Sequence, residues 1–494
     1  MSSDRLFLNY IDGAWVPGSG STPIADTNPA DLRETIGWVT DSTTEDVAAA
    51  VQAAERAYPA WRATPVPVRG RIVRDAGRLF EQRAAEIGRV LTREEGKILA
   101  EAEGEVLKGA TLMEWFSGES RRLNGQTVPS EIPNTFAYTT REPLGVVGLI
   151  TPWNFPMAIP AWKIAPALVA GNTVVIKGAE QTPWVTELVV RTFIDAGVPP
   201  GVLNMVQGRG ATVGAALVEH PAVHAISFTG STEIGHLINA RGAALGKRVQ
   251  CELGGKNPLI LLADGDVDLA VAATAKGAFG STGQRCTATS RAIVHRAVLD
   301  EFTHKLAAAA AAVVPGNGLD PASTMGPSVD SGQFGKVHEY LQIGAAEGAE
   351  LVCGGGRAAQ GDLEHGLFTQ PTIWHVQRTM RVAREEIFGP VLSVVAVDDF
   401  EEAIAVANAV EFGLTSSIYT RDVNTVFRYV DQIQTGMLHV NSPTIGGEAQ
   451  LPFGGMKKTG IGPREHSTHA IDFFTEWKTV YIDHGGGFRG GNLY

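Results

Sequence analysis

The segment Val146-Val147-Gly148-Leu149-Ile150 is the first of four short apolar runs that decide the fold. The others are Thr173–Ile176, Val202–Val206 and Ala225–Phe228, and a stretch with helical spacing follows each run. Separations of roughly 25 to 30 residues leave room for the crossover helix that parallel strands require. The pattern predicts an α/β fold in which this part is a doubly wound, Rossmann-like parallel sheet with a nucleotide-binding edge.

A second alternation of strand and helix patterns begins after Gly254. Strand-like runs at Leu259–Leu262 and Ala292–His295 alternate with helical runs at Leu269–Phe279 and Leu299–Val314. Since 494 residues exceed one ordinary core, we expect a second α/β domain here. Upstream, residues 48–113 are rich in alanine and carry apolar side chains at helical intervals, which predicts helices that cover the first sheet.

Two polar, strand-like segments lie outside both alternations, at Asn134–Thr140 and Asp472–Ile482. We expect these edge segments to pair, to project from the body and to mediate oligomers. The predicted organisation is a cofactor-binding domain (1–124 and 145–253), a catalytic domain (254–466) and oligomerisation segments (125–144 and 467–494). The glycine-rich tail Gly485–Gly491 is expected to be mobile.

Composition excludes several classes of protein. The net charge of −12 is spread without long like-charge runs, which argues against a nucleic-acid or anionic-membrane partner. The three cysteines, Cys251, Cys286 and Cys353, show no spacing suited to zinc, so no metal is expected. Met1–Asp12 lacks the features of a signal peptide, and no apolar stretch is long enough to span a bilayer. We expect a soluble protein of a reducing cytoplasm.

Cys286 and Glu252 are the candidate reactive residues. Cys286 lies between a predicted helix and strand, where its sulfur can face a cleft, and we expect the neighbouring Arg285 to favour the thiolate. Glu252 precedes the flexible pair Gly254-Gly255, where a partly desolvated carboxylate can act as a general base. The simpler interpretations are a small buried hydrophobic residue and a solvated carboxylate.

The run Gly230–Gly235 follows a predicted strand and opens a helix. Its small residues allow backbone NH groups at the helix N-terminus to approach a phosphate, although an ordinary capped helix has the same appearance. Lys177 and Glu180 end another predicted strand, at the edge where such sheets bind nucleotides, or are ordinary surface charges.

These pieces occur in an order that resembles the aldehyde dehydrogenase superfamily over nearly the whole chain. The segments that carry the resemblance are Thr151–Pro156, Lys177 with Glu180, Gly230–Gly235, Glu252–Lys256, Gln284–Cys286, Glu386–Pro390 and Pro452–Gly455. The resemblance implies an enzyme that oxidises an aldehyde to a carboxylic acid with NAD or NADP. It also implies a homodimer or homotetramer.

The resemblance implies a role for each catalytic residue. Cys286 adds to the aldehyde carbon, and the oxyanion is held by the Asn154 side-chain amide and the Cys286 backbone NH. Loss of hydride to the nicotinamide leaves a thioester. Glu252 then deprotonates the water that releases the acid.

The resemblance also assigns the cofactor contacts. Lys177 and Glu180 would bind the adenosine ribose, Ser231 the pyrophosphate, and Glu386 the nicotinamide ribose; Trp153, Gly230, Gly235, Leu253 and Phe388 would complete the site. A carboxylate at Glu180 accepts hydrogen bonds from a ribose 2′-OH and repels a 2′-phosphate, which favours NAD over NADP. Gly178 stands where the family usually has proline, from which we expect a looser loop.

Within the superfamily, three segments resemble the branch that oxidises 2-oxoglutarate semialdehyde (2,5-dioxopentanoate). They are Gly283–Arg291, Asn441–Thr444 and Gly462–Glu465. Arg285 would either recognise a distal carboxylate of this substrate or form a structural pair. Phe155, Trp162 and Phe453 would line an apolar channel, which also suits another semialdehyde or an aliphatic or aromatic aldehyde.

Three other classes of protein fit the sequence less well. A CoA-acylating dehydrogenase has no need of a water-activating base such as Glu252. A cysteine hydrolase acting on esters needs a histidine beside Cys286, and no motif above contains one. A catalytically silent binding protein is disfavoured because nucleophile, base and oxyanion donor are all present.

Overall fold

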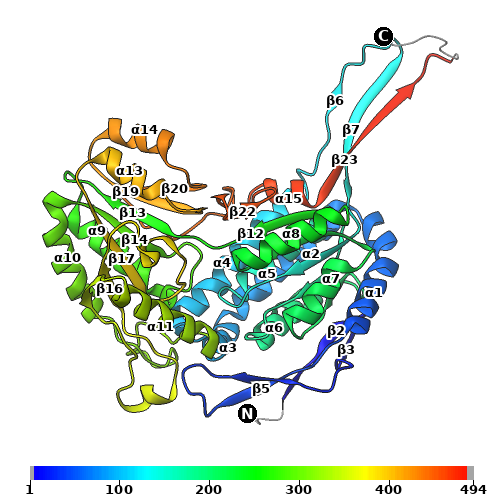
Figure 1. Ribbon diagram of the computed structural model, residues 1–494. Helices are drawn as coiled ribbons and strands as arrows, with labels where there is room; N and C mark the ends of the chain where they lie inside the picture. Colours follow the sequence, from blue (N-terminus) through cyan, green and yellow to red (C-terminus); the bar gives the residue numbers. More distant parts are fainter. Residues whose placement is uncertain (1–4, 487–494) are drawn as a thin grey trace.

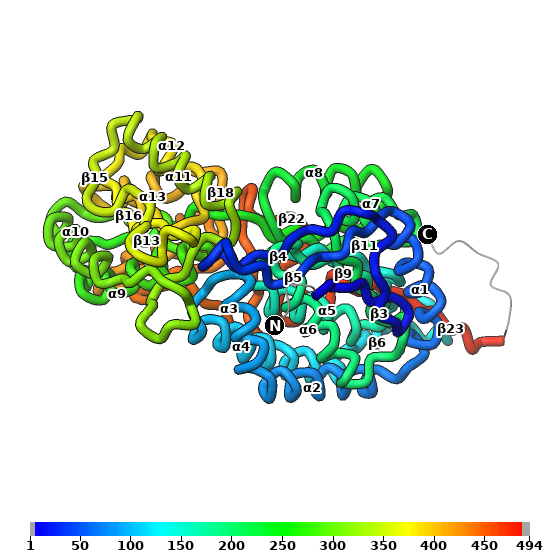
Figure 2. Tube along the Cα trace, turned by 90° about the horizontal axis from the view of Figure 1, so that it is seen from below, coloured from blue at the N-terminus to red at the C-terminus, as the bar shows by residue number. Residues whose placement is uncertain are grey.

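The computed structural model describes residues 5–486, and two large sheets with their helices form two lobes (Figures 1 and 2). The first sheet has eight strands in the order β22-β12-β11-β8-β9-β10-β2-β3. Its strands are β2 (Asn9–Ile11), β3 (Ala14–Val16), β8 (Val146–Ile150), β9 (Thr173–Lys177), β10 (Leu203–Met205), β11 (Val223–Thr229), β12 (Arg248–Glu252) and β22 (Gly460–Ile461).

The parallel sheet predicted from the four apolar runs is confirmed. Strands β12, β11, β8, β9 and β10 are mutually parallel, and every residue of β8 and β9 is buried. Because both faces of these strands are covered, they are apolar runs without alternation. Antiparallel strands close the two edges: β2 and β3 at one edge and β22 at the other.

Helices cover both faces of the first sheet. They are α1 (Thr44–Ala63), α2 (Val66–Gln82), α3 (Ala84–Glu95), α4 (Leu99–Glu119), α5 (Ala158–Ala170), α6 (Pro183–Asp195), α7 (Ala215–Glu219) and α8 (Thr232–Ala244). Helices α1, α7 and α8 share one hydrophobic core with the sheet, and α2 to α6 share another on the opposite face. The predicted helices of residues 48–113 are thus present. Helix α5 is buried along its whole length and ends at Gly171, whose φ of 103° favours glycine.

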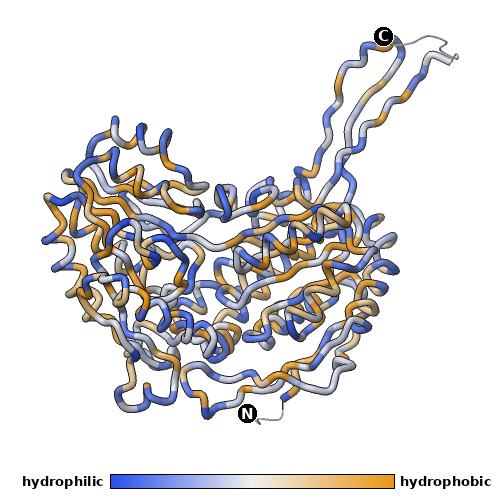
Figure 3. Tube along the Cα trace, in the orientation of Figure 1, coloured by the Kyte–Doolittle hydropathy of each residue, from blue (hydrophilic) through white to orange (hydrophobic). Residues whose placement is uncertain are grey.

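The second lobe is built on a seven-stranded sheet in the order β15-β16-β17-β14-β13-β19-β20. Its strands are β13 (Asn257–Leu261), β14 (Thr289–His295), β15 (Glu350–Cys353), β16 (Thr372–His375), β17 (Val391–Val397), β19 (Thr415–Tyr419) and β20 (Met437–Val440). Its helices are α9 (Val267–Phe279), α10 (Arg296–Ala311), α11 (Ser331–Ala346), α12 (Arg381–Arg384), α13 (Phe400–Asn408) and α14 (Val423–Gln432). The second α/β unit expected after Gly254 is therefore confirmed, and Figure 3 shows its inner strands as hydrophobic.

The two polar segments form an arm that projects from the first lobe (Figure 1). Strand β7 (Thr135–Pro143) pairs antiparallel with β23 (Thr475–Asp483) along its full length, and the short β6 (Thr127–Val128) adds a third strand. The pairing predicted from sequence is observed. Most of the expected mobile tail Gly485–Gly491 lies outside the described residues.

Two short elements near the C-terminus follow the second lobe in sequence but pack against the first lobe. Strand β22 follows the second sheet in sequence but pairs with β12 of the first. Helix α15 (His469–Phe473) precedes the arm strand and buries Ala470, Ile471 and Phe473 in the core that contains α5. The chain thus crosses back to the first lobe before it enters the arm.

The remaining elements join the lobes. A small sheet of β1 (Leu6–Phe7), β5 (Thr35–Val39) and β4 (Ile24–Thr27) leads to a loop that crosses to the second lobe (Figure 2), where the Leu32 amide donates to the His365 carbonyl at 2.9 Å. Strands β18 (Phe412–Gly413) and β21 (Met456–Lys457) form a short ladder. Among the helices of the described chain, none combines the length and apolar character needed to cross a bilayer.

Candidate active site

Two cavities meet at Cys286 between the lobes. One, of about 390 Å³, is lined by Phe155, Trp162, Glu252, Arg285, Phe453 and others. The second, of about 170 Å³, is lined by Trp153, Asn154, Gly230, Ser231, Glu386, Phe388 and others. Thr229, Leu253 and Cys286 line both. The structure therefore gathers most of the residues singled out from sequence around one thiol.

The cysteine loop lies at the amino end of the second sheet and opposite the carboxyl end of the first. Cys286 follows a helical turn at Gly280–Gly283 and precedes β14, as predicted. Asn257, at the start of β13, fixes the loop by donating to the carbonyls of Cys286 (2.7 Å) and Ala288 (2.8 Å). Ser281 and Thr282 have φ of 48° and 57°, a strained conformation for residues with a Cβ.

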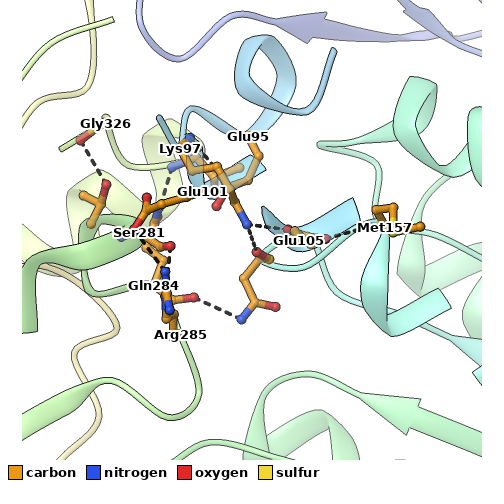
Figure 4. Close-up of polar contacts among 12 residues, drawn as sticks. Glu95, Lys97, Glu101, Glu105, Met157, Ser281, Gln284, Arg285 and Gly326 are labelled. Atoms are coloured by element: carbon orange, nitrogen blue, oxygen red, sulfur yellow. Dashed lines mark hydrogen bonds and ion pairs between the residues drawn. The ribbon is translucent and has the colours of Figure 1, made fainter. Parts of the chain in front are cut away.

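Glu101 of α4 holds this strained turn (Figure 4). Its carboxylate accepts from the Ser281 amide at 2.9 Å and from Arg285 Nη2 at 3.0 Å, and Arg285 Nε donates to Ser281 Oγ at 2.9 Å. Arg285 lines the larger cavity, but its guanidinium is engaged by the loop and by Glu101.

The Cys286 thiol is surrounded by groups that oppose ionisation. Burial, together with the nearby carboxylates of Glu252 and Glu386, raises its pKa to about 12. The expectation that Arg285 favours the thiolate is therefore wrong, because the guanidinium is paired with Glu101 instead. A proton acceptor is needed to generate the nucleophile.

Glu252 is the carboxylate that faces the same cavity. It ends β12 directly beside Thr229 of β11, because the two parallel strands are in register. Its side chain is buried, and Oε2 has no hydrogen-bond partner among the described residues. Burial raises the pKa of Glu252 well above 4.5, and the nearby Glu465 carboxylate raises it further. A carboxyl group with a raised pKa holds its proton more readily and is a stronger base once it is ionised.

Asn154 is held from both sides. Its side-chain amide donates to the Gln284 carbonyl at 3.0 Å, and its own backbone carbonyl accepts from Lys97 Nζ at 2.7 Å. Gln284 in turn accepts from the Val329 amide at 3.1 Å. An amide group uses only one of its two donor hydrogens in the contact with Gln284, which leaves one for a ligand beside Cys286.

The smaller cavity has features that suit a dinucleotide. The side-chain oxygen of Thr229, in the cavity wall, is buried and has no partner among the described residues, and the same holds for Thr232, just outside the cavity in the first turn of α8. Ser231 is the N-cap of this helix but makes no capping hydrogen bond with its side chain. These oxygens and the first amides of α8 provide donors for a pyrophosphate.

The other end of this cavity is closed by aromatic rings and a carboxylate. Trp153 and Phe388 meet edge to face with ring centroids 5.5 Å apart, and Phe388 has a φ of 61°. Gln333 fixes this strained residue by donating to its carbonyl at 2.8 Å. Glu386 accepts from the Gly255 amide at 2.8 Å, and a Cβ on Gly254 would lie 2.3 Å from the Glu386 carboxylate. Close packing thus explains a glycine at this position.

Three of the expected cofactor residues lie apart from the two cavities. Lys177 and Glu180 follow β9 and pair with each other at 2.7 Å, at the same sheet edge but lining neither cavity. Gly235 packs behind Leu253 of the cavity wall, and a Cβ at this position would lie 2.2 Å from the Leu253 side chain. The loop at Gly178 is not loosened: Gly178 is buried, and a Cβ there would meet Thr186 Oγ1 at 2.3 Å.

The larger cavity contains residues that the sequence interpretation did not assign. Glu465 accepts from Trp162 Nε1 at 2.8 Å and forms an ion pair with Lys163, which also donates to Ser227 Oγ at 2.7 Å. His466 packs between the rings of Trp162 (4.6 Å between centroids) and Phe453 (5.1 Å). Glu465 ended one of the quoted motifs, whereas Lys163 and His466 carried no signal in the sequence.

His466 does not form a cysteine–histidine pair. Among the described residues neither ring nitrogen has a hydrogen-bond partner, and the groups that shift the pKa of Cys286 do not include it. Within residues 5–486, no three His, Cys, Asp or Glu side chains are arranged to hold a metal ion.

Comparisons with known proteins agree with this geometry. The sequence profile of the aldehyde dehydrogenase family matches residues 15–480. The chain is 42% identical to the alpha-ketoglutaric semialdehyde dehydrogenase of Bacillus subtilis, with 98% of this chain and 99% of that protein aligned. It is 45% identical to the alpha-ketoglutarate semialdehyde dehydrogenase of Haloferax volcanii, with 96% and 98% aligned.

A solved structure gives the same result for the fold. Betaine aldehyde dehydrogenase from Staphylococcus aureus in complex with NAD+ superposes with a TM-score of 0.95 at 33% identity, over 98% of this chain and 95% of that one. The chain therefore belongs to the aldehyde dehydrogenase family, as its motifs predicted, and is an oxidoreductase that acts on an aldehyde.

Proposed function

We propose that the protein oxidises an aldehyde to a carboxylic acid with Cys286 as nucleophile, Glu252 as general base and Asn154 as oxyanion donor. The observation that carries the proposal is that the two cavities meet at Cys286. An aldehyde in the larger cavity and a nicotinamide in the smaller one would then flank the same sulfur from two sides.

The residues of the chain supply the first bond-forming step. The Cys286 thiol loses its proton, its sulfur bonds to the aldehyde carbon, and the carbonyl oxygen becomes an oxyanion. The free amide hydrogen of Asn154 and the Cys286 backbone NH stabilise this charge. Phe155, Trp162 and Phe453 line the cavity in which the aldehyde would lie.

NAD(P), when bound, accepts the hydride that the adduct loses. We propose that Ser231 and the α8 N-terminus hold its pyrophosphate, Glu386 the nicotinamide ribose, and Lys177 with Glu180 the adenosine ribose. Trp153 and Phe388 would flank the nicotinamide, while Gly230, Gly235 and Leu253 shape the site. A carboxylate at Glu180 supports a preference for NAD over NADP.

Glu252 completes the reaction. It takes a proton from water, the oxygen of that water bonds to the thioester carbon, and the carbon–sulfur bond breaks to release the acid and regenerate the thiolate. The raised pKa of Glu252 brings its ionisation towards working pH. A CoA-acylating enzyme would not need this base, and the unpaired His466 does not support a cysteine hydrolase.

The substrate we propose is 2-oxoglutarate semialdehyde. Two relatives with more than 40% identity over nearly their whole length are named for this aldehyde. Other semialdehydes and aliphatic or aromatic aldehydes are the alternatives, since the cavity wall is largely apolar. Arg285, engaged by Glu101, would position the cysteine loop rather than bind the distal carboxylate.

A panel of aldehydes assayed with NAD and with NADP, followed by the absorbance of the reduced cofactor, tests this proposal. We expect the highest kcat/KM for 2-oxoglutarate semialdehyde with NAD. Equal values for this substrate and for pentanal would contradict the assigned substrate, and absence of cofactor reduction with every aldehyde would contradict the assigned reaction.

We also propose a role for each segment of the chain in this reaction or in assembly. Residues 1–124 and 145–253 would form the cofactor domain, 254–466 the catalytic domain, and 125–144 with 467–494 the oligomerisation segments of a homodimer or homotetramer. Exposed Phe136, Trp477, Tyr481 and Ile482 on the arm support this role. The three free cysteines support a reducing compartment such as the cytoplasm.

A further inference from the structure

Two polar side chains in the wall of the larger cavity have no function in the mechanism above. Lys108 belongs to α4, and His466 follows β22; both line the cavity that contains Phe155, Trp162 and Cys286. Neither lies in a motif that suggested chemistry. Their position on the substrate side makes them candidates for contact with the part of the aldehyde remote from Cys286.

His466 is a buried polar group whose ring nitrogens make no hydrogen bond of normal geometry with a described residue. The residue is 2% exposed, and neither Nδ1 nor Nε2 has a hydrogen-bond partner among the described residues. Burial lowers the pKa of the imidazole to about 3, and the Lys108 charge acts in the same direction, whereas a weak hydrogen bond to the Glu448 backbone opposes them. The ring is therefore neutral, with one donor and one acceptor nitrogen, of which at most one is engaged by Glu448. A buried unpaired polar group costs free energy, which a polar ligand would recover.

The backbone at His466 is also strained. His466 and Ser467 have φ of 58° and 49°, and two consecutive residues with a Cβ in this region are unfavourable. The conformation directs the ring against Trp162 and Phe453 on the cavity wall. Strain of this kind is maintained at sites where the position of a side chain matters.

Lys108 is the partly buried cation of this wall. Its Nζ donates to the Gly447 carbonyl, which uses one of three ammonium hydrogens, and it forms no ion pair with a described residue. Burial lowers the pKa of its side chain, although Glu448 opposes this effect. An anion at this position would restore the favourable ionisation of the ammonium.

Apart from Glu252, whose buried carboxyl has a raised pKa, the other charges that line the cavity are paired or exposed. Glu101 pairs with Arg285, Glu105 with Lys97 and Glu465 with Lys163. Lys276 is a second cation of the lining, but its side chain is exposed and therefore well hydrated. Lys108 is therefore the cation in the sheltered part of the cavity that forms no ion pair with a described residue, although Glu448 lies near enough to act on it electrostatically.

We infer that Lys108 and His466 form a subsite for the 2-oxo acid end of the substrate, with the Lys108 ammonium on the carboxylate and the His466 ring donating to an oxygen of the oxo acid. This inference rests on the proposed function and deepens it. A cavity of about 390 Å³ accommodates a five-carbon chain between Cys286 and this subsite, within the usual range of small-molecule sites. Specificity then comes from an unpaired charge at one end of a cavity whose other charges are mostly paired or exposed.

The test compares three aldehydes: 2-oxoglutarate semialdehyde, succinic semialdehyde and pentanal, which has no carboxylate. Lys108→Met is expected to lower kcat/KM by about 10- to 100-fold for the two acids, through KM, and to leave pentanal nearly unchanged. Lys247→Met is the matched control and should change none of the three, since Lys247 is also a partly buried lysine that donates to a backbone carbonyl, that of His220, but lines neither cavity. Lys108→Arg should recover part of the loss.

His466 is tested by a pair of substitutions. His466→Asn tolerates a positive φ and keeps a donor, whereas His466→Leu keeps the bulk without the donor. We expect the leucine variant to lose more activity with 2-oxoglutarate semialdehyde than with succinic semialdehyde, because only the former carries the oxo group. Turnover of pentanal shows whether each variant is folded.

The outcomes separate the subsite from the proposed function. If the wild-type enzyme prefers the acids and Lys108→Met keeps that preference, the subsite is refuted and the proposed function stands. If the wild-type enzyme itself shows no preference over pentanal, the assigned substrate and the subsite both fail. Binding of 2-oxoglutarate, the expected product, to Cys286→Ala by calorimetry gives a second measure, and Lys108→Met in that background should weaken it by about 10-fold or more.

Discussion

Lys97 and Glu105 form an ion pair in the interior, with Nζ and Oε2 2.7 Å apart and side chains 1% and 0% exposed. Each partner also contacts the candidate site (Figure 4): Lys97 donates to the Asn154 carbonyl, and Glu105 accepts from the amides of Met157 and Ala158 at the start of α5. The pair therefore connects α4 to the oxyanion donor and to the helix that lines the substrate cavity.

Removal of one partner of this pair should destabilise the fold. Lys97→Met leaves the Glu105 carboxylate buried without its cation, and such losses are typically about 3–5 kcal/mol. Chemical denaturation should show this decrease in the free energy of unfolding. Lys305→Met, which breaks the exposed pairs with Asp268 and Glu301, should cost less than about 1 kcal/mol. Equal effects would contradict the importance assigned to burial.

The fold could largely be predicted from periodicity because its inner strands are buried on both faces. Runs such as Val146–Ile150 are apolar without alternation, and the structure places them in a parallel sheet. Strand β22 could not be predicted in this way. Gly460-Ile461 is two residues long and pairs through tertiary contact with β12, so no local pattern indicates it.

The pH dependence of turnover should follow Glu252. A base must be deprotonated to act, and the pKa of Glu252 is raised well above 4.5 by burial and by Glu465. Steady-state kcat should therefore fall as pH decreases through this raised pKa, at a higher pH than an ordinary glutamate would give. Rate profiles of the wild-type enzyme and of Glu252→Gln check this. The same low-pH decline in the variant would assign the effect to another group.

The reactivity of the thiol should increase when the Glu252 charge is removed. Glu252 is one cause of the raised pKa of Cys286, so Glu252→Gln should lower that pKa. Alkylation of Cys286 by iodoacetamide, measured across pH, should then shift to lower pH in the variant. A shift to higher pH would indicate that Glu252 accepts the thiol proton in the free enzyme.

Cys286→Ala should abolish dehydrogenase activity and leave NAD binding nearly unchanged. The sulfur forms the covalent bond, whereas the cavity residues proposed to hold the cofactor, such as Glu386 and Ser231, are untouched. Cofactor reduction and calorimetric NAD binding measure the two properties separately. More than a small percentage of wild-type activity in this variant is incompatible with the proposed nucleophile.

The arm should be needed for assembly. Phe136, Tyr481 and Ile482 are 47%, 68% and 47% exposed on β7 and β23, which is unusual for large apolar side chains on a projecting sheet. Light scattering should show a dimer or tetramer, and Tyr481→Ser with Ile482→Ser should shift it towards monomer. A wild-type monomer at micromolar concentration would contradict this expectation.

The candidate site was only partly predictable from sequence. Cys286, Glu252 and Asn154 lie in motifs whose order carries information, and in the structure Glu252 lines the larger cavity, Asn154 the smaller one and Cys286 both. The charge environment of Cys286 was not predictable, because Arg285 pairs with Glu101, which lies on a helix far away in sequence. His466 is polar by identity but acquires its unpaired, buried state only through packing against Trp162 and Phe453.

The measurement that tests the account most directly is the fate of the acyl group in Glu252→Gln. If Glu252 acts on the deacylating water, the first turnover should still reduce one equivalent of cofactor as a burst. Steady-state turnover should then fall by about a hundred- to ten-thousand-fold. Intact-protein mass spectrometry should show a thioester on Cys286. Unaltered steady-state turnover without such an adduct would contradict the proposed mechanism.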